Sequence, residues 1–147
     1  MKVEPLISSD KEDWSKLYHG YANFYKMPMN SGILDKVLDW IFNPEIKFYA
    51  IGVKSEQGEL IGFMHFREMP SPLRGMLVGF LDDLFVHPDY RGSGAVQLLF
   101  QDLKLRAQEN GWPYVRWITA SDNQRARAVY DQISDTIDFV TYQMHIK

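Results

Sequence analysis

Cysteine is absent from this chain of 147 residues, which excludes disulfide bonds and thiolate metal ligands. The chain has few histidines, and no two of them have the spacing of a helical metal-binding pair. They are His19, His65, His87 and His145. We therefore expect no metal cofactor.

Long apolar runs and basic tracts are also lacking. No apolar run reaches the ~18 residues that a membrane-spanning helix needs, and the first five residues contain no apolar signal region. The net charge is −3, and no basic tract of the kind that binds nucleic acid is present. We expect a cytoplasmic protein that has neither a membrane nor a nucleic acid as its partner. The length and the 46% hydrophobic content fit one globular domain, residues 1–147.

Hydrophobic spacing and turn residues predict alternating strands and helices. The predicted strands are residues 3–7, 47–54, 59–69, 76–86, 114–119 and 137–146. The predicted helices are a segment from Trp14 that ends at Met27-Pro28, and residues 32–42, 93–110 and 122–133. Gln57-Gly58 indicates an antiparallel hairpin, whereas the strand–helix–strand crossover after Val86 implies a parallel pair. The order predicts an α/β domain with a mixed sheet.

The most informative segment is residues 81–96, where a strand ends at Pro88 and a glycine-containing turn opens a helix. Backbone N–H groups at such a helix start are unpaired and can bind an anionic phosphate. A tight turn that needs glycine for a positive φ angle would have the same composition. The segment is neither a Walker loop nor a dinucleotide fingerprint, because no Gly-Lys-Ser/Thr follows and a third glycine is missing.

This segment resembles the central motif of the GNAT (GCN5-related) N-acetyltransferases, a strand ending in Val-x-Pro followed by Arg/Gln-x-x-Gly-x-Gly/Ala. The matching residues are Val86-His87-Pro88, Arg91 and Gly94, while Val96 stands where glycine or alanine is usual. A second match is Asn123-x-x-Ala126-x-x-x-Tyr130, whose ends share one helix face. The Gly-Phe pair that often follows this tyrosine is absent.

The resemblance extends over nearly the whole chain. It implies an α/β (α+β) fold with a mixed, mostly antiparallel central sheet of 6–7 strands and helices on both faces. Residues 82–86 followed by 89–92 look like the diamine and polyamine acetyltransferase branch. Relatives are often dimers, so a homodimer is expected.

What the resemblance implies for the co-substrate is an acetyl-CoA site. The turn amides would hold the pyrophosphate, the preceding strand would carry the pantetheine, and Asn123 would hydrogen-bond the pantetheine arm. The residues implied are Leu84, Phe85, Val86, Arg91, Gly92, Ser93, Gly94, Ala95, Val96, Asn123 and Tyr130.

Acetyl transfer needs a neutral amine, so a carboxylate that accepts the ammonium proton is expected. The resemblance favours Asp82, with Asp83 in reserve. Neighbours on a strand point to opposite faces, so only one of the two aspartates can face the acceptor. Asp82 could instead form a structural ion pair with an arginine. Tyr130 would protonate the leaving thiolate, or it could pack with its hydroxyl at the rim of a core.

Aromatic residues at helical spacing from Tyr18 to Tyr25 are consistent with a core stripe. They could also line an acceptor pocket, where Tyr21 and Tyr25 would face a cationic amine. His65 alternates with apolar neighbours, which indicates a hydrogen-bonded core histidine.

The predicted function is transfer of an acetyl group from acetyl-CoA to a primary amine of a small molecule, such as a polyamine, a diamine or an amino-acid-like compound. Two alternatives stay open. One is transfer to a protein or peptide amine, and the other is a weakly catalytic acyl-CoA-binding module.

Overall fold

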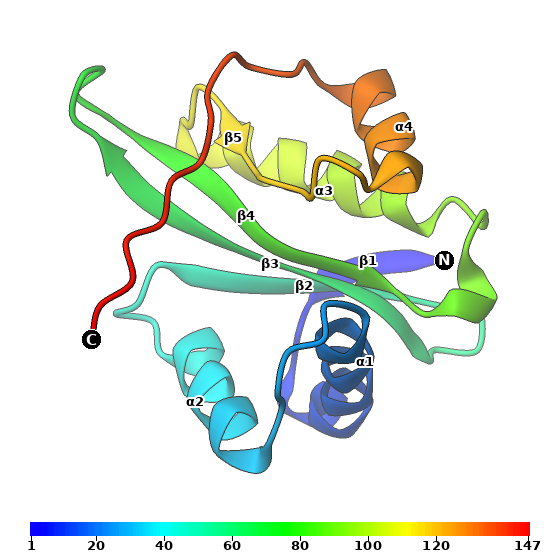
Figure 1. Cartoon of the computed structure of the whole chain (residues 1–147). Coiled ribbons are helices and arrows are strands. Elements are labelled where there is room, and N and C mark those ends of the chain that lie inside the picture. The colour runs from blue at the N-terminus through cyan, green and yellow to red at the C-terminus, as the bar shows by residue number, and fades with distance from the viewer. The chain divides into compact units, whose positions relative to one another are not determined.

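The computed structural model describes residues 1–147, and contacts within the chain divide them into two units, Met1–Trp117 and Ile118–Lys147. The first unit contains five strands and three helices, shown in Figure 1. They are β1 (Lys2–Pro5), α1 (Lys11–Phe24), α2 (Ser31–Phe42), β2 (Phe48–Lys54), β3 (Leu60–Ser71), β4 (Met76–Val86), α3 (Ala95–Asn110) and β5 (Val115–Arg116). The second unit contains α4 (Gln124–Ile133). None of the helices combines the length and the apolarity that crossing a bilayer requires.

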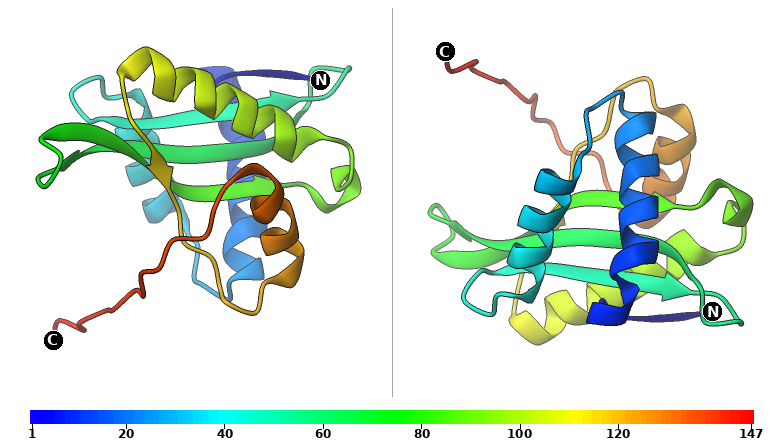
Figure 2. Two further views of the ribbon diagram at one scale, coloured as in Figure 1. Left: turned by 90° about the horizontal axis from the view of Figure 1, so that it is seen from above. Right: turned by 90° about the horizontal axis from the view of Figure 1, so that it is seen from below.

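The strands of the first unit form one sheet in the order β1-β2-β3-β4-β5. The first four are antiparallel neighbours, and β5 pairs with β4 in parallel, as the crossover through α3 predicted. Helices α1 and α2 cover one face of the sheet and α3 covers the other (Figures 1 and 2).

Each face of the sheet has its own apolar core. The core beneath α3 contains Met64, Leu81 and Leu99, and the core beneath α1 and α2 contains Trp14, Phe63 and other fully buried side chains. These two cores fix the helices on a rigid sheet, so side chains on neighbouring strands meet in a defined register.

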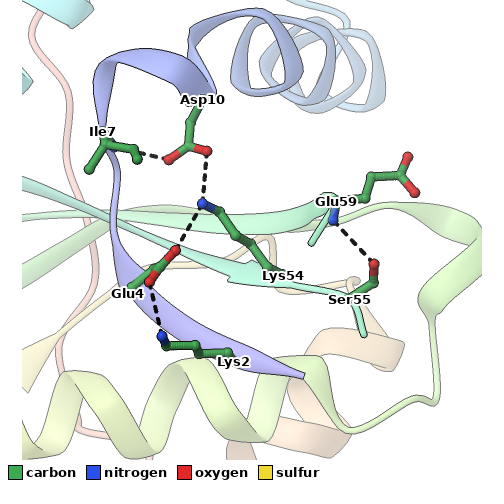
Figure 3. A network of polar contacts seen from close by, with 7 residues as sticks. All are labelled: Lys2, Glu4, Ile7, Asp10, Lys54, Ser55 and Glu59. Atoms are coloured by element: carbon green, nitrogen blue, oxygen red, sulfur yellow. Dashed lines mark hydrogen bonds and ion pairs between the residues drawn. The ribbon is translucent and has the colours of Figure 1, made fainter. Parts of the chain in front are cut away.

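The start of α1 is held by a polar network that links it to β1 and β2 (Figure 3). The Lys54 ammonium lies 2.8 Å from a Glu4 carboxylate oxygen and 3.1 Å from one of Asp10. The other oxygen of Asp10 accepts a hydrogen bond from the backbone N–H of Ile7 at 2.9 Å. The hydrogen bond with Glu4 raises the pKa of Lys54, although its partial burial opposes this. The network therefore fixes the rotation of α1 at its first turn.

Three sequence predictions need correction. The sheet has five strands instead of six or seven. The strand expected at 114–119 is limited to β5, which pairs only with Gly79 and Phe80 of β4. The strand expected at 137–146 does not form, and Phe139 and Tyr142 are 75% and 90% exposed. Alternating apolar residues define a strand face but do not specify a neighbouring strand, and the sheet contains no strand from this segment.

Candidate active site

Asp82 is an extra residue in the pairing of β4 with β3. His65 pairs with Asp83 and the next residue, Phe66, pairs with Leu81, so Asp82 has no opposite residue. Such a β-bulge breaks the alternation of side chains between the two faces. Asp82 and Asp83 therefore line the same pocket on the α1 and α2 face. The prediction that only one of the two carboxylates faces this site is wrong, because it assumed regular alternation.

Asp83 accepts hydrogen bonds from two aromatic partners, the buried His65 and the partly buried Tyr18. The Tyr18 hydroxyl and the His65 Nδ1 atom both lie 2.8 Å from its Oδ2 oxygen. Burial raises the pKa of Asp83, but the hydrogen bonds from His65, Tyr21 and Tyr18 outweigh burial and bring the pKa below its ordinary value. Asp83 is thus a fixed anion and a weak proton acceptor.

The hydrogen bonds of His65 define its tautomer. The indole N–H of Trp14 donates to His65 Nε2 at 3.0 Å, and an indole nitrogen can only donate. Nε2 therefore carries no proton, and Nδ1 carries the proton that is donated to Asp83. His65 is fully buried, which confirms the prediction of a hydrogen-bonded core histidine.

Asp82 has a different environment from Asp83. Its Oδ1 oxygen lies 3.2 Å from Arg67 Nη2, which is the ion pair that the sequence left as an alternative. Its Oδ2 oxygen is buried and has no hydrogen-bond partner. Burial raises the pKa of Asp82 above its ordinary value, although the charge of Arg67 opposes the rise. Of the two carboxylates, Asp82 is thus the stronger proton acceptor.

The two aspartates share what we call the α1/α2 pocket, a cavity of about 500 Å³. Aromatic and aliphatic side chains from the helices meet charged side chains of the sheet at this cavity. Its lining residues are Tyr18, Val37, Trp40, Ile46, Lys47, Phe48, Arg67, Glu68, Asp82 and Asp83.

Tyr18 lines this pocket, whereas Tyr21 and Tyr25, which were expected there, do not. The Tyr21 ring packs against Phe63 and Phe85, and the Tyr25 ring packs against that of Tyr21. The sequence also gave no role to Arg67. Arg67 pairs with Phe48 on β2 and with Phe80 on β4, and paired residues on adjacent strands share one face of the sheet. Knowledge of this strand pairing would have identified Arg67 as a residue of the pocket face.

Beyond Phe80, β4 has no strand neighbour on the β5 side. Pairing with β5 ends at Phe80, so the segment Asp82–Val86 has an open backbone edge there. Unpaired strand edges bind extended groups that carry amides. Leu84 and Val86 pack in the core beneath α3, whereas Phe85 packs beneath α1. The predicted pantetheine strand therefore has the free hydrogen-bonding groups that its role needs.

The turn before α3 presents several free amides. Gly92 and Gly94 have φ angles of 77° and 91°, which favour glycine. In the turn, Ser93 N–H bonds to Tyr90 and Ala95 N–H bonds to the Ser93 hydroxyl, but the N–H groups of Gly92, Gly94, Val96 and Gln97 have no acceptor in the chain. The Val96 side chain packs against the core and leaves the turn accessible. The local structure fits an anionic phosphate.

Arg91 and Phe85 also line a second pocket of about 500 Å³. This pocket lies between α1 and the turn that follows β4, with Gly20 and Asn23 on the helix side. Arg91 is thus close to the glycine turn and belongs to a cavity different from that of the aspartates.

In the second unit, Asn123 caps α4 through its side chain, which accepts a hydrogen bond from Ala126 N–H at 3.3 Å. Its amide NH₂ group is not used by this cap. Tyr130 lies two turns later on α4, and its carbonyl oxygen accepts hydrogen bonds from Ser134. The predicted helix is therefore present, with Asn123 as its N-cap residue and Tyr130 within it.

The fold is that of an N-acetyltransferase. The chain superposes on the crystal structure of ribosomal-protein-alanine N-acetyltransferase from Brucella melitensis biovar Abortus 2308 with a TM-score of 0.80 at 25% identity, over 99% of this chain and 100% of that one. Residues 13–134 match the acetyltransferase (GNAT) family, and the chain belongs to this family. It is thus an N-acetyltransferase, and the family implies an acyl-CoA donor.

Two relatives match nearly the full chain. The D-amino-acid N-acetyltransferase HPA3 of Saccharomyces cerevisiae is 29% identical over 142 residues, which cover 96% of this chain and 88% of the relative. The uncharacterized N-acetyltransferase YhfO of Bacillus subtilis is 27% identical and covers 99% of this chain and 98% of its own length.

Proposed function

We propose that the protein transfers the acetyl group of acetyl-CoA to the primary amine of a small molecule of the amino-acid or diamine type, bound in the α1/α2 pocket. The observation that carries this proposal is the β-bulge, which brings two carboxylates of opposite pKa shift into one cavity beside the open edge of β4. The yeast relative's action on D-amino acids supports an amine of this size.

The donor would bind along β4 and the turn before α3. The free amides at Gly92, Gly94, Val96 and Gln97 would hold the pyrophosphate, and the open edge of Asp82–Val86 would hydrogen-bond the pantetheine amides. When bound, acetyl-CoA supplies an activated acyl carbon. Asn123 would add a hydrogen bond from its free NH₂ group.

Asp82 would accept the proton of the substrate ammonium. Its raised pKa favours proton uptake, and its Oδ2 oxygen lacks the hydrogen-bond donor that an ammonium would provide. The amine lone pair would then form the new N–C bond, the C–S bond would break with its electron pair on sulfur, and the nitrogen would release its second proton. Tyr130 would give its hydroxyl proton to this thiolate and regain a proton from the one that the nitrogen releases, while the proton on Asp82 passes to solvent. Asp83 stays ionised and attracts the cationic amine.

The test is an acetyl-transfer assay with acetyl-CoA and a panel of amino acids, diamines and polyamines, compared with peptide N-termini. Turnover of small amines, with Tyr130→Phe and Asp82→Asn each at least 100-fold slower, is the expected result. Wild-type-like turnover by Tyr130→Phe would remove its role as the acid. Tight CoA binding without turnover on any amine would contradict the proposed reaction.

A further inference from the structure

The α1/α2 pocket contains two cationic side chains that acid–base chemistry with an amine does not require. Arg67 lies on β3 and Lys47 immediately precedes β2, and both line the cavity together with the two aspartates. A pocket that binds only a cationic amine gains nothing from these charges, since like charges repel.

Arg67 has donors to spare. It contacts Asp82 through one nitrogen at 3.2 Å, and its guanidinium lies 5.0 Å from the centre of the Phe80 ring. Half of its side chain is exposed, and it has no other carboxylate partner. A guanidinium carries five N–H donors in a planar fork that matches a carboxylate, so Arg67 can hold Asp82 and a second acid group together.

Lys47 takes part in none of the ion pairs of the molecule. Its backbone carbonyl accepts a hydrogen bond from Glu68 N–H at 3.0 Å, which fixes the residue beside the end of the pocket. The Glu68 carboxylate is itself occupied, because the indole N–H of Trp112 donates to it at 2.7 Å. Lys47 is therefore a free positive charge in the cavity.

The pocket is thus lined by two carboxylates and two available cations. The Asp82 carboxylate touches Arg67, so an acid–base pair of opposite charges already meets at this cavity. In an α-amino acid, the ammonium and the carboxylate are attached to the same carbon and so contact neighbouring protein charges. A diamine or polyamine has no group that would pair with Arg67 or Lys47.

Resting on the proposed function, we propose that Arg67, assisted by Lys47, binds the carboxylate of the acceptor, so the substrate is an amino acid and not a diamine or polyamine. Arg67 is then the residue that determines specificity. It positions the substrate so that the amine lies at the Asp82 carboxylate.

The experiment compares substrates that differ only by the carboxylate, namely phenylalanine (D and L) with phenethylamine, and lysine (D and L) with 1,5-diaminopentane. Acetylation of each is measured for the wild type, Arg67→Met, Arg67→Lys and Lys47→Met. Arg74→Met is the matched control, because Arg74 also stacks on an aromatic ring, at 5.2 Å from Tyr114, but does not line the pocket.

We expect the wild type to prefer each amino acid to its amine. Arg67→Met should lower kcat/KM for the amino acid about 10- to 100-fold relative to its amine, mainly through KM, as expected for losing a charged hydrogen-bonded pair. Arg67→Lys should restore part of this preference, Lys47→Met should reduce it less, and Arg74→Met should leave it unchanged.

The ratio between paired substrates separates binding of the carboxylate from any effect on Asp82. Losing the Arg67 charge would raise the pKa of Asp82 further, but this change would affect acetylation of the amino acid and acetylation of the corresponding amine equally. An equal loss on both substrates, or a wild type that prefers the diamine, would overturn the inference and leave the proposed function intact. No turnover of any amine, despite CoA binding, would overturn the proposed function itself.

Discussion

Replacing each aspartate of the α1/α2 pocket with asparagine should separate catalysis from stability. Asp82→Asn removes the proposed proton acceptor with its raised pKa, whereas Asp83→Asn removes an anion that Tyr18 and His65 hold at 2.8 Å. Although the residues are neighbours on β4, we expect opposite effects. Asp82→Asn should fold normally and turn over slowly, while Asp83→Asn should be less stable.

The activity effect follows from the amine. An alkylamine with a pKa of about 10 is neutral in only about one molecule per thousand at pH 7. Loss of a positioned base lowers rates by roughly 10²- to 10⁴-fold. For Asp82→Asn we therefore expect a 100-fold or greater loss in kcat/KM at pH 7, and this loss should shrink as pH approaches the amine pKa. In the wild type, the acidic limb of the pH–rate profile should lie above the ordinary pKa of 3.8, because the proposed reaction requires ionised Asp82.

The stability effect of Asp83→Asn can be worked from its two hydrogen bonds. A hydrogen bond to a charged group contributes about 1 kcal/mol more than a neutral one, so two bonds give about 2 kcal/mol. For a chain of this length that lowers Tm by about 4–8 °C. The folded-state pKa of Asp83 is lowered, so its stabilising effect is full above the unfolded pKa and is lost as pH falls through the folded one.

Ionisation of Asp82 has the opposite effect on the stability of the fold. Because its folded-state pKa is raised, its ionised form reduces stability at neutral pH, and this effect disappears as pH falls. Asp82→Asn should thus melt at or above the wild-type temperature at pH 7. Thermal melts at pH 4 and pH 7, together with pH–rate profiles, measure both effects. Full activity of Asp82→Asn at pH 7 with strong destabilisation would refute the assignment, because it would make Asp82 the structural residue.

Three further changes test the parts that position the site. Trp14→Phe removes the donor to His65 and leaves a buried acceptor unsatisfied, so we expect a loss of about 1–3 kcal/mol in denaturant unfolding, with no change from Ser15→Ala as the surface control. Gly94→Ala forces a φ angle of 91° on a residue with a Cβ, and calorimetry should show weaker CoA binding. Lys54→Met leaves Asp10 without a cation and Glu4 with only the more distant Lys2, at 3.6 Å, so its Tm should fall, and an unchanged Tm would mean that the network does not hold α1.

Hydrophobic spacing was sufficient to predict the elements that have strong local signals. The helices at 32–42 and 93–110 and the hairpin around Gln57-Gly58 agree with α2, α3 and the β2–β3 pair to within two or three residues. These features depend on neighbours in the chain, which a single sequence records.

The geometry of the site depends on contacts between distant segments. The β-bulge at Asp82 is a property of how β4 pairs with β3, and the sequence of β4 alone does not reveal it. Arg67 on β3, Tyr18 on α1 and Lys47 just before β2 line one cavity, although they are far apart in the sequence. Residues 137–146 alternate like a strand but form none, because a strand needs a neighbouring strand that the local sequence does not specify.

A crystal structure of the protein with CoA and N-acetylphenylalanine tests the central claim most directly. We predict pantetheine along the open edge of Asp82–Val86, the product amide nitrogen within hydrogen-bonding distance of Asp82, and the product carboxylate on Arg67. A product bound in the second pocket, beside Arg91 and Gly20, with the α1/α2 pocket empty, would contradict it.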